Sequence, residues 1–134
     1  MARIAILPIA ALIALAASPA LAKDTPSGEQ QLARLLAGRV AGKPMDCIPL
    51  LTADENVQVI DKTAIVYGGG DVIYVNRPSE ADQLSSDDML IDEPTNDEVC
   101  SIDTITLRDR YTNVYDGFVG LGQFVPYTRV PKKS

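Results

Sequence analysis

Residues 1–22 form an apolar leader, and this leader decides how much of the chain remains to fold. Its one charged residue is Arg3, and the small residues Ala20 and Ala22 stand at the −3 and −1 positions of a signal-peptidase site. This pattern is typical of a cleaved secretory signal peptide. A membrane anchor is the alternative, but it needs about 20 continuous apolar residues, and the run here is shorter. We predict cleavage between Ala22 and Lys23.

Cleavage leaves 112 of the 134 residues, which predicts a single small globular domain over 23–134. Removing Arg3 from the 12 basic residues leaves 11 against 18 acidic ones, so the formal charge changes from −6 to −7. A surface this acidic repels nucleic acid and anionic membranes, so neither is an expected partner. No Lys or Arg stands between Arg77 and Arg108, a span that holds nine acidic residues. They are Glu80, Asp82, Asp87, Asp88, Asp92, Glu93, Asp97, Glu98 and Asp103.

Histidine is absent from the chain, and this absence excludes several kinds of site. Ser-His-Asp and Cys-His nucleophile systems, histidine-ligated zinc and an imidazole pH switch all need this residue. Two carboxylates suffice for glycoside hydrolysis, but nothing in the sequence distinguishes any two of the 18 acids. The sequence therefore assigns no catalytic residue, no metal ligand and no cofactor.

The two cysteines, Cys47 and Cys100, allow one intramolecular pairing. Export would place them in a compartment where disulfides form and persist. A redox-active thiol usually has a C-x-x-C partner or a neighbouring cation, and neither cysteine has one in sequence. We therefore predict a structural disulfide, worth roughly 4 kcal/mol in the chain-entropy model.

A short amphipathic helix is predicted over 28–38. Ser27 can cap it, and Gln30 completes a capping box. The apolar stripe consists of Leu32, Leu35, Leu36 and Val40. Gly38 and Gly42 then supply stop signals.

The remainder predicts a fold of class α+β, mainly β, with the helix on a mostly antiparallel sheet of about five strands. The strands are expected at residues 57–60, 63–67, 72–76, 101–107 and 117–127, the last ended by Pro126. All seven aromatic residues lie at or beyond Tyr67, so the C-terminal half must supply the bulky part of the core. Gly68-Gly69-Gly70 is interpreted as a hairpin turn rather than a phosphate-binding loop, because a strand and Asp71 follow it.

A long acidic loop is predicted over 77–99, with one helical turn at residues 79–84. Its stretch Asp92–Glu98 offers carboxylate oxygens to calcium, which is one hypothesis for the loop. The stretch lacks the glycine and the distant glutamate of an EF-hand loop. A solvated acidic loop is therefore the favoured interpretation.

The stretch Tyr111-Thr112-Asn113-Val114-Tyr115 has two interpretations. Tyrosine often serves interfaces, so the stretch is a candidate for an exposed binding ribbon. Core packing or a strand face is the favoured alternative.

Five short segments, in order, resemble a family of small exported proteobacterial proteins classed as a domain of unknown function. They are Cys47-Ile48, Val59–Thr63, Tyr74–Pro78, Val99–Asp103 and Leu121–Tyr127. Members of that family often carry further cysteines near the positions of Ala81 or Asp82 and Val119, where this chain has none. The resemblance implies export, the Cys47–Cys100 bridge and a small β-rich fold, and it implies no activity.

These features favour a non-enzymatic periplasmic or secreted protein that binds or assists a basic protein partner, because an acidic surface attracts one electrostatically. No stable membrane anchor is expected in the mature chain. One alternative is a carboxylate- or metal-dependent periplasmic hydrolase. Another is an envelope structural or stress protein.

Overall fold

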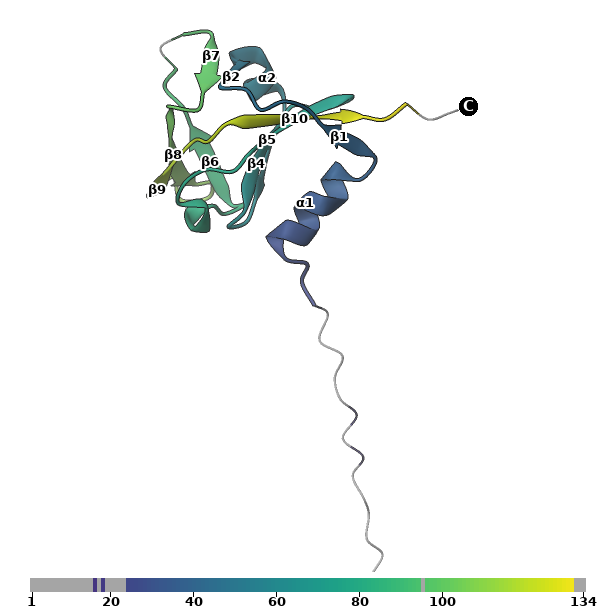
Figure 1. The fold of residues 1–134 in the computed structure, drawn as a ribbon. Helices are drawn as coiled ribbons and strands as arrows, with labels where there is room; N and C mark the ends of the chain where they lie inside the picture. Colours follow the sequence, from purple (N-terminus) through teal and green to yellow (C-terminus); the bar gives the residue numbers. More distant parts are fainter. Residues whose placement is uncertain (1–15, 17, 19–23, 95, 132–134) are drawn as a thin grey trace, which may run out of the picture.

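The computed structural model describes residues 16, 18, 24–94 and 96–131 (Figure 1). The predicted cleavage site between Ala22 and Lys23 lies outside these residues. The elements in chain order are α1 (Gly28–Leu36), β1 (Arg39–Ala41), β2 (Cys47–Pro49), α2 (Leu50–Glu55), β3 (Val57–Ile60), β4 (Ala64–Tyr67), β5 (Val72–Asn76), η1 (Ala81–Gln83), β6 (Asp88–Ile91), β7 (Glu98–Cys100), β8 (Thr104–Asp109), β9 (Tyr115–Gly120) and β10 (Phe124–Arg129).

The described strands form three antiparallel sheets, which confirms the predicted α+β, mainly β class. The orders are β1-β10-β5-β4-β3, β2-β7 and β6-β8-β9. The expected number of about five strands is too low, since the described residues form ten. The strands missed are the short ones β1, β2, β6 and β7, which contain three or four residues each and show too little alternation to stand out.

The predicted hairpin around Gly68–Gly70 is confirmed. β4 and β5 pair antiparallel on either side of it, with Tyr67 opposite Tyr74. Gly68 and Gly70 adopt φ of 84° and 73°, a region that residues with a Cβ rarely enter. The glycines therefore serve the turn.

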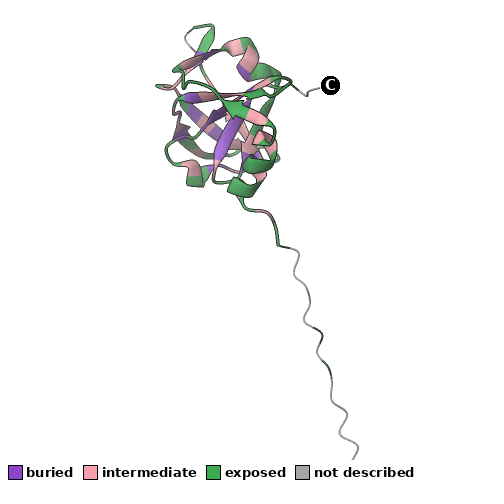
Figure 2. Ribbon diagram, turned by 45° about the vertical axis from the view of Figure 1, so that its right-hand side comes forward, coloured by how far each residue is buried: buried purple, intermediate pink, exposed green. Residues whose placement is uncertain are grey.

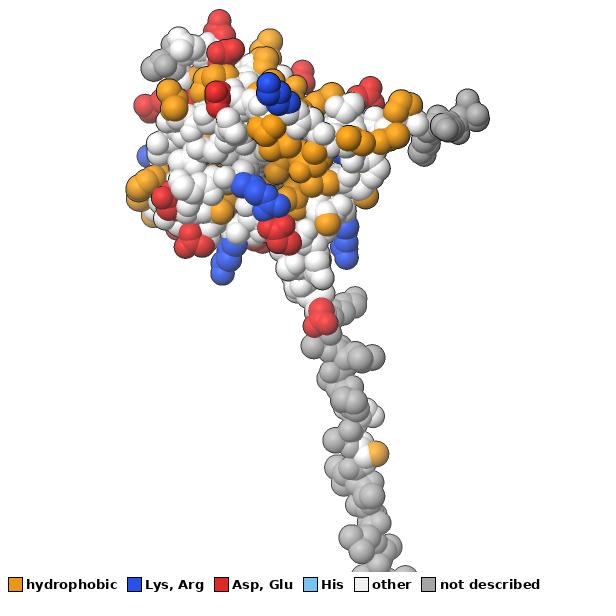
Figure 3. All heavy atoms as spheres, in the orientation of Figure 1, with side chains coloured by type: hydrophobic (Ala, Val, Ile, Leu, Met, Phe, Trp, Pro, Cys, Tyr) orange, Lys and Arg blue, Asp and Glu red, His pale blue; other side chains and the backbone are white. Residues whose placement is uncertain are grey.

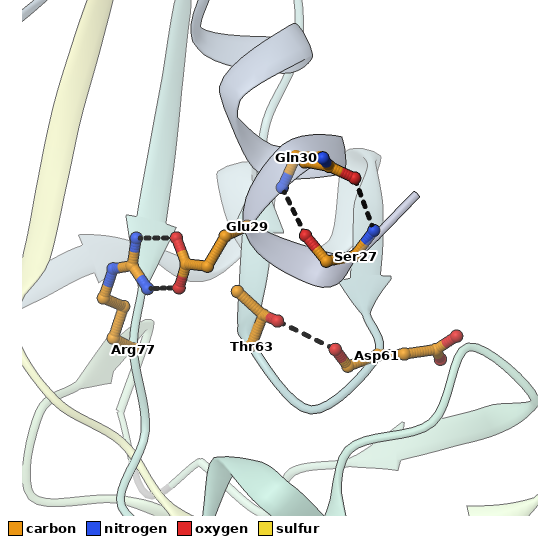
Figure 4. Close-up of polar contacts among 6 residues, drawn as sticks. All are labelled: Ser27, Glu29, Gln30, Asp61, Thr63 and Arg77. Atoms are coloured by element: carbon orange, nitrogen blue, oxygen red, sulfur yellow. Dashed lines mark hydrogen bonds and ion pairs between the residues drawn. The ribbon is translucent and has the colours of Figure 1, made fainter. Parts of the chain in front are cut away.

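The predicted capping box at the start of α1 is confirmed (Figure 4). Ser27 Oγ accepts from the Gln30 N–H at 3.2 Å, and the Ser27 N–H donates to Gln30 Oε1 at 2.9 Å. α1 ends at Leu36, two residues earlier than predicted, and Gly38 at φ 74° turns the chain into β1. Val40 therefore belongs to β1 rather than to the helical stripe, and it is 59% exposed.

Two contacts fix α1 against the five-stranded sheet. The Arg77 guanidinium donates to both Glu29 carboxylate oxygens, at 2.6 and 3.0 Å (Figure 4). The start of the helix also approaches the β3–β4 turn so closely that a Cβ on Gly28 would lie 1.8 Å from Thr63 Oγ1. Leu32 is buried among apolar residues of β3, β4 and β5.

The predicted strand over 117–127 is two strands, β9 and β10, and Pro126 does not end the second. The Pro126 carbonyl accepts from the Gly42 N–H at 2.7 Å, on the β1 side of β10. The N–H and C=O of one strand residue point to the same side. An N–H on Pro126 would therefore point to the β1 side, just beyond the last residue of β1. Because it would not point toward the central strand β5, its absence removes no hydrogen bond between β10 and β5.

The predicted loop over 77–99 is only partly a loop. Its helical turn is present as η1, but β6 and most of β7 also lie within it. β6 pairs with β8 through the whole of residues 88–91. The sequence interpretation missed β6 because acidic residues flank it and its first residue, Asp88, is itself a buried acid.

The predicted disulfide joins the directly opposite residues Cys47 and Cys100 of β2 and β7. Ile48 and Val99, the next pair in this ladder, are buried in the main apolar cluster with Tyr67 and Phe124. Figure 2 shows the buried residues gathered on strands in the interior. None of the helices among the described residues is long and apolar enough to cross a membrane.

Candidate functional site

The Tyr111–Tyr115 stretch lies on the surface, so the interpretation as core packing is wrong; the alternative of a strand face holds for Tyr115, the first residue of β9, and the exposure agrees with the ribbon interpretation. Tyr111 is 80% exposed, Val114 60% and Tyr115 57%. The stretch forms the turn between β8 and β9 and the first residue of β9. Large apolar side chains on a turn have no facing element to pack against, which leaves them available to a partner.

A hollow of about 260 Å³ opens at this turn. It is lined by Asp109, Thr112, Val114, Tyr115 and Asp116. Two acidic residues and a tyrosine therefore line the same small volume. We call this hollow the hairpin hollow.

Asp109 is held in place by the turn that follows it. Its Oδ1 accepts from the Tyr111 N–H at 2.9 Å, from the Thr112 N–H at 2.7 Å and from Thr112 Oγ1 at 3.0 Å. These bonds to Thr112 and Tyr111 lower the pKa of Asp109, because they stabilise its charged form. The carboxylate is thus ionised and fixed before any ligand arrives.

Asp116 reaches the rim of the hairpin hollow through an irregularity in the sheet. Leu107 pairs with Gly117 but Arg108 pairs with Tyr115, so Asp116 is an extra residue in β9. Such a bulge re-aims side chains that a regular ladder would place on one face. Asp116 is exposed.

A third carboxyl group, that of Asp88, lies buried beside this pair. Asp88 stands directly opposite Asp109 in the β6–β8 ladder and is 2% exposed, with neither carboxyl oxygen hydrogen-bonded. Burial, followed by the charge of Asp116 and that of Asp109, raises the pKa of Asp88. The Nη2 of Arg110 donates to the Asp88 backbone carbonyl at 3.5 Å rather than to its side chain.

We expect Asp88→Asn to stabilise the protein at neutral pH. The pKa of the Asp88 carboxyl group is higher in the folded state than in the unfolded state. The stability that this group contributes is therefore present below about pH 4 and is lost as the pH rises through the raised pKa. The amide stays neutral, so the free energy of unfolding at pH 7 should increase. Denaturant unfolding at pH 3 and pH 7 measures the difference, which should nearly vanish at pH 3.

The control for this variant is Asp82→Asn, at an exposed residue of η1. Its stability should stay within about 0.5 kcal/mol of the parent protein at both pH values. Equal effects of the two substitutions at pH 7 would contradict an unfavourable buried charge at Asp88.

The hairpin hollow has the chemistry to receive a cationic side chain. Carboxylates form short, charge-assisted hydrogen bonds with guanidinium or ammonium groups, and a tyrosine face attracts a cation within about 6 Å. The carboxylates of Asp109 and Asp116 are not neutralised from within, since Arg77–Glu29 is the one ion pair among the described residues. The Arg108 guanidinium at this turn donates to the Asn113 carbonyl at 3.1 Å and forms no ion pair with either carboxylate, which leaves both free for a cation of a partner.

The acidic residues of the 77–99 segment do not converge on a calcium site. In the part of the chain that the structure describes, one group of three potential ligand atoms lies within 4.8 Å, and it is Cys47, Glu98 and Cys100. Both of its sulfur atoms are in the disulfide and offer no thiolate. Acidic side chains gather instead over the surface near β7, α2 and the β6–β8–β9 sheet (Figure 3).

Asp92, a half-buried acid, lines a cavity of about 70 Å³ together with Asp54 and Tyr67. Asp92 Oδ2 is buried without a hydrogen-bond partner. Burial, Asp103 and Asp54 raise the pKa of Asp92, and burial together with Asp92 raises that of Tyr67. The cavity has room for about two water molecules.

The sequence interpretation named Tyr111–Tyr115 but neither Asp109 nor Asp116. Asp109 had a local signal, because Asp followed by Thr three residues later is common where an aspartate side chain organises a turn. Asp116 had none, since a bulge depends on how β9 aligns with β8.

Comparisons with known proteins add no relative to this description. No family model, no curated protein and no solved structure matches the chain.

Proposed function

We propose that this chain is a non-enzymatic periplasmic or secreted protein that binds or assists a basic protein partner through the hairpin hollow. The observation that carries the proposal is the pair of carboxylates, Asp109 and Asp116, beside the exposed ring of Tyr115. The disulfide and the resemblance to small exported proteins support the location.

An arginine or lysine of the partner would enter the hollow. Its charged end would meet Asp109, which is already ionised and oriented, and its stem would lie against Tyr115. Tyr111 and Val114 add exposed apolar area around this contact. Interfaces commonly combine an aromatic anchor with a charge pair that is shielded from water.

The remaining acidic surface would assist association rather than hold the complex. Unpaired carboxylates spread over the neighbouring sheets create a negative potential that speeds the approach of a cationic protein. The effect weakens with salt, because the screening length is about 10 Å at 0.1 M ionic strength. Binding should therefore fall steeply between about 50 and 500 mM salt.

The test is capture of basic proteins from a periplasmic extract at low salt, followed by titration of each captured protein. We expect Tyr115→Ala and Asp116→Asn each to weaken binding about tenfold or more, which corresponds to about 1.4 kcal/mol. The matched controls are Phe118→Ala, an exposed aromatic residue that does not line the hollow, and Glu93→Gln, an exposed acid outside it.

Two results would contradict the proposal. One is that no basic protein is retained at low salt. The other is that Glu93→Gln weakens binding as much as Asp116→Asn does, because the contact would then be diffuse attraction without a site.

A carboxylate-dependent hydrolase is the second candidate, and Asp92 is the observation that favours it. A half-buried acid with a raised pKa beside a second carboxylate resembles the acid–base pairs of hydrolases. An activity screen with and without divalent ions tests this reading. If the hydrolase candidate is correct, Asp92→Asn abolishes any activity found and Asp97→Asn leaves that activity unchanged.

A further inference from the structure

One face of the five-stranded sheet is only partly covered. α1 has nine residues and is therefore about 14 Å long, and a helix is about 10 Å across. Five strands at about 4.8 Å spacing span about 19 Å between the outer strands. The helix leaves part of this face open.

A groove of about 500 Å³ occupies the open part. Its apolar lining comes from Leu35 of α1, Val66 of β4 and Ile73 of β5. Val66 and Ile73 belong to the apolar cluster beneath α1, and Leu35 packs against that cluster. Polar walls come from Asn56, Gln58, Gly68 and Gly69.

A second hollow, of about 610 Å³, adjoins the groove and shares Leu35 and Arg39 with it. Arg34 and Arg129 also line this second hollow, together with Val130. We call these two adjoining hollows together the helix groove; the first supplies an apolar part and the second a cationic part. Each of the two hollows is within the size range of pockets that hold small organic ligands.

The three arginines of the helix groove have no acidic partner among the residues that the structure describes. Arg39 is held by backbone carbonyls, with Nη2 donating to Gly70 O at 2.8 Å and Nη1 to Asp71 O at 3.0 Å. These contacts fix its position and leave its charge uncompensated. Arg34 and Arg129 are exposed and make no side-chain hydrogen bond with another described residue.

This cluster of positive charge is unexpected on a chain with a formal charge of −6. The side of α1 that faces the end of β10 places three arginine residues next to an apolar surface. An anionic group attached to an apolar chain satisfies both parts at once, because the chain leaves water and the charge meets arginine.

We propose that the helix groove binds a single-chain amphiphilic carboxylate. Its chain would lie over Leu35, Val66 and Ile73, and its carboxylate would meet Arg39, Arg34 and Arg129. Arginine suits this role because its planar fork of donors matches the two oxygens of a carboxylate. The site is separate from the hairpin hollow and does not depend on the proposed protein partner.

The test is a calorimetric titration with dodecanoate below its micelle concentration, on the full mature chain. We expect saturable binding of one equivalent. Two probes separate the contributions of chain and charge: acetate has the charge without the chain, and dodecyltrimethylammonium has the chain with the opposite charge. Both should bind at least tenfold more weakly than dodecanoate.

The variant that tests the charge is the double substitution Arg34→Gln with Arg129→Gln, at two exposed residues. It should weaken dodecanoate binding at least tenfold. The matched control, Lys62→Gln with Arg110→Gln, removes the same number of positive charges away from the groove and should leave binding within twofold. Leu35→Ser tests the apolar part and should reduce the advantage of dodecanoate over octanoate.

Three results would overturn the proposal. They are the absence of dodecanoate binding, equal binding of the ammonium amphiphile, and equal loss of binding in the two double variants. Tyr115→Ala should bind dodecanoate normally, so failure of the partner proposal and failure of this one are distinguishable.

Discussion

Replacing both cysteines, Cys47→Ser with Cys100→Ser, should lower the free energy of unfolding by about 4 kcal/mol. The bridge closes a loop with a sequence separation of 53, and in the chain-entropy model a loop of this length restricts the unfolded chain by about that amount. Small domains are stable by only about 5–15 kcal/mol. Denaturant unfolding of the double variant and of the parent protein measures the loss.

The loss should appear first at β2 and β7. These strands pair only with each other, over three residue pairs, and an isolated two-stranded ribbon is marginal in water. Without the bridge, we expect the amides of Ile48 and Val99 to exchange with solvent faster than those of β4. Reduction of the parent protein should reproduce the effect. Equal unfolding midpoints for the parent and the double variant would contradict it.

Phe124→Ala should destabilise the protein by about 3–5 kcal/mol, the range for removing a fully buried aromatic ring. Phe124 is 0% exposed, and its ring packs edge-to-face against Tyr67 with the ring centroids 5.6 Å apart. The cavity left behind would open the main apolar cluster between the sheets. Thermal or denaturant unfolding monitored by circular dichroism measures the change.

The chain contains a matched control for this substitution, because its one other phenylalanine is Phe118. Phe118 lies on β9 and is 50% exposed. Phe118→Ala should cost no more than about 1 kcal/mol. Similar losses at the two positions would mean that the cluster around Phe124 does not dominate stability.

Elements with strong local signals were predictable from the sequence. The start of α1 follows from Ser27 and Gln30, which satisfy free N–H groups at the helix start without help from the rest of the chain. The β4–β5 hairpin follows from consecutive glycines between two β-branched runs. Such signals act over a few residues, so tertiary contacts do not change them.

Elements that depend on distant partners were not predictable in this way. Val40 fits the spacing of the helical stripe, but Gly38 turns the chain so that β1 pairs with β10, and Val40 lies opposite Thr128 near the other end of the chain. β6 forms because β8 offers it an edge. Pro126 is tolerated because its missing N–H faces past the end of β1.

The candidate sites divide in the same way. The cysteines and the Tyr111–Tyr115 stretch were identifiable as residues of interest from their types and order. Their surroundings were not, since the exposure of Tyr115 depends on where the β8–β9 turn projects from the sheet. No sequence pattern indicated that the arginines of the helix groove lie together. Arg34, Arg39 and Arg129 belong to three separate elements, α1, β1 and β10.

The sequence by itself determined the fold class, the capped helix, the glycine hairpin and the one possible disulfide, because each depends on residue types and short spacings. Tertiary structure alone decided which charges lie together. It placed Asp109 and Asp116 around Tyr115 through a bulge, buried Asp88 behind them, and gathered three arginines beside an apolar groove. The physical reason is that electrostatic and apolar contacts act between positions that strand pairing brings together, and strand pairing is set by the whole chain.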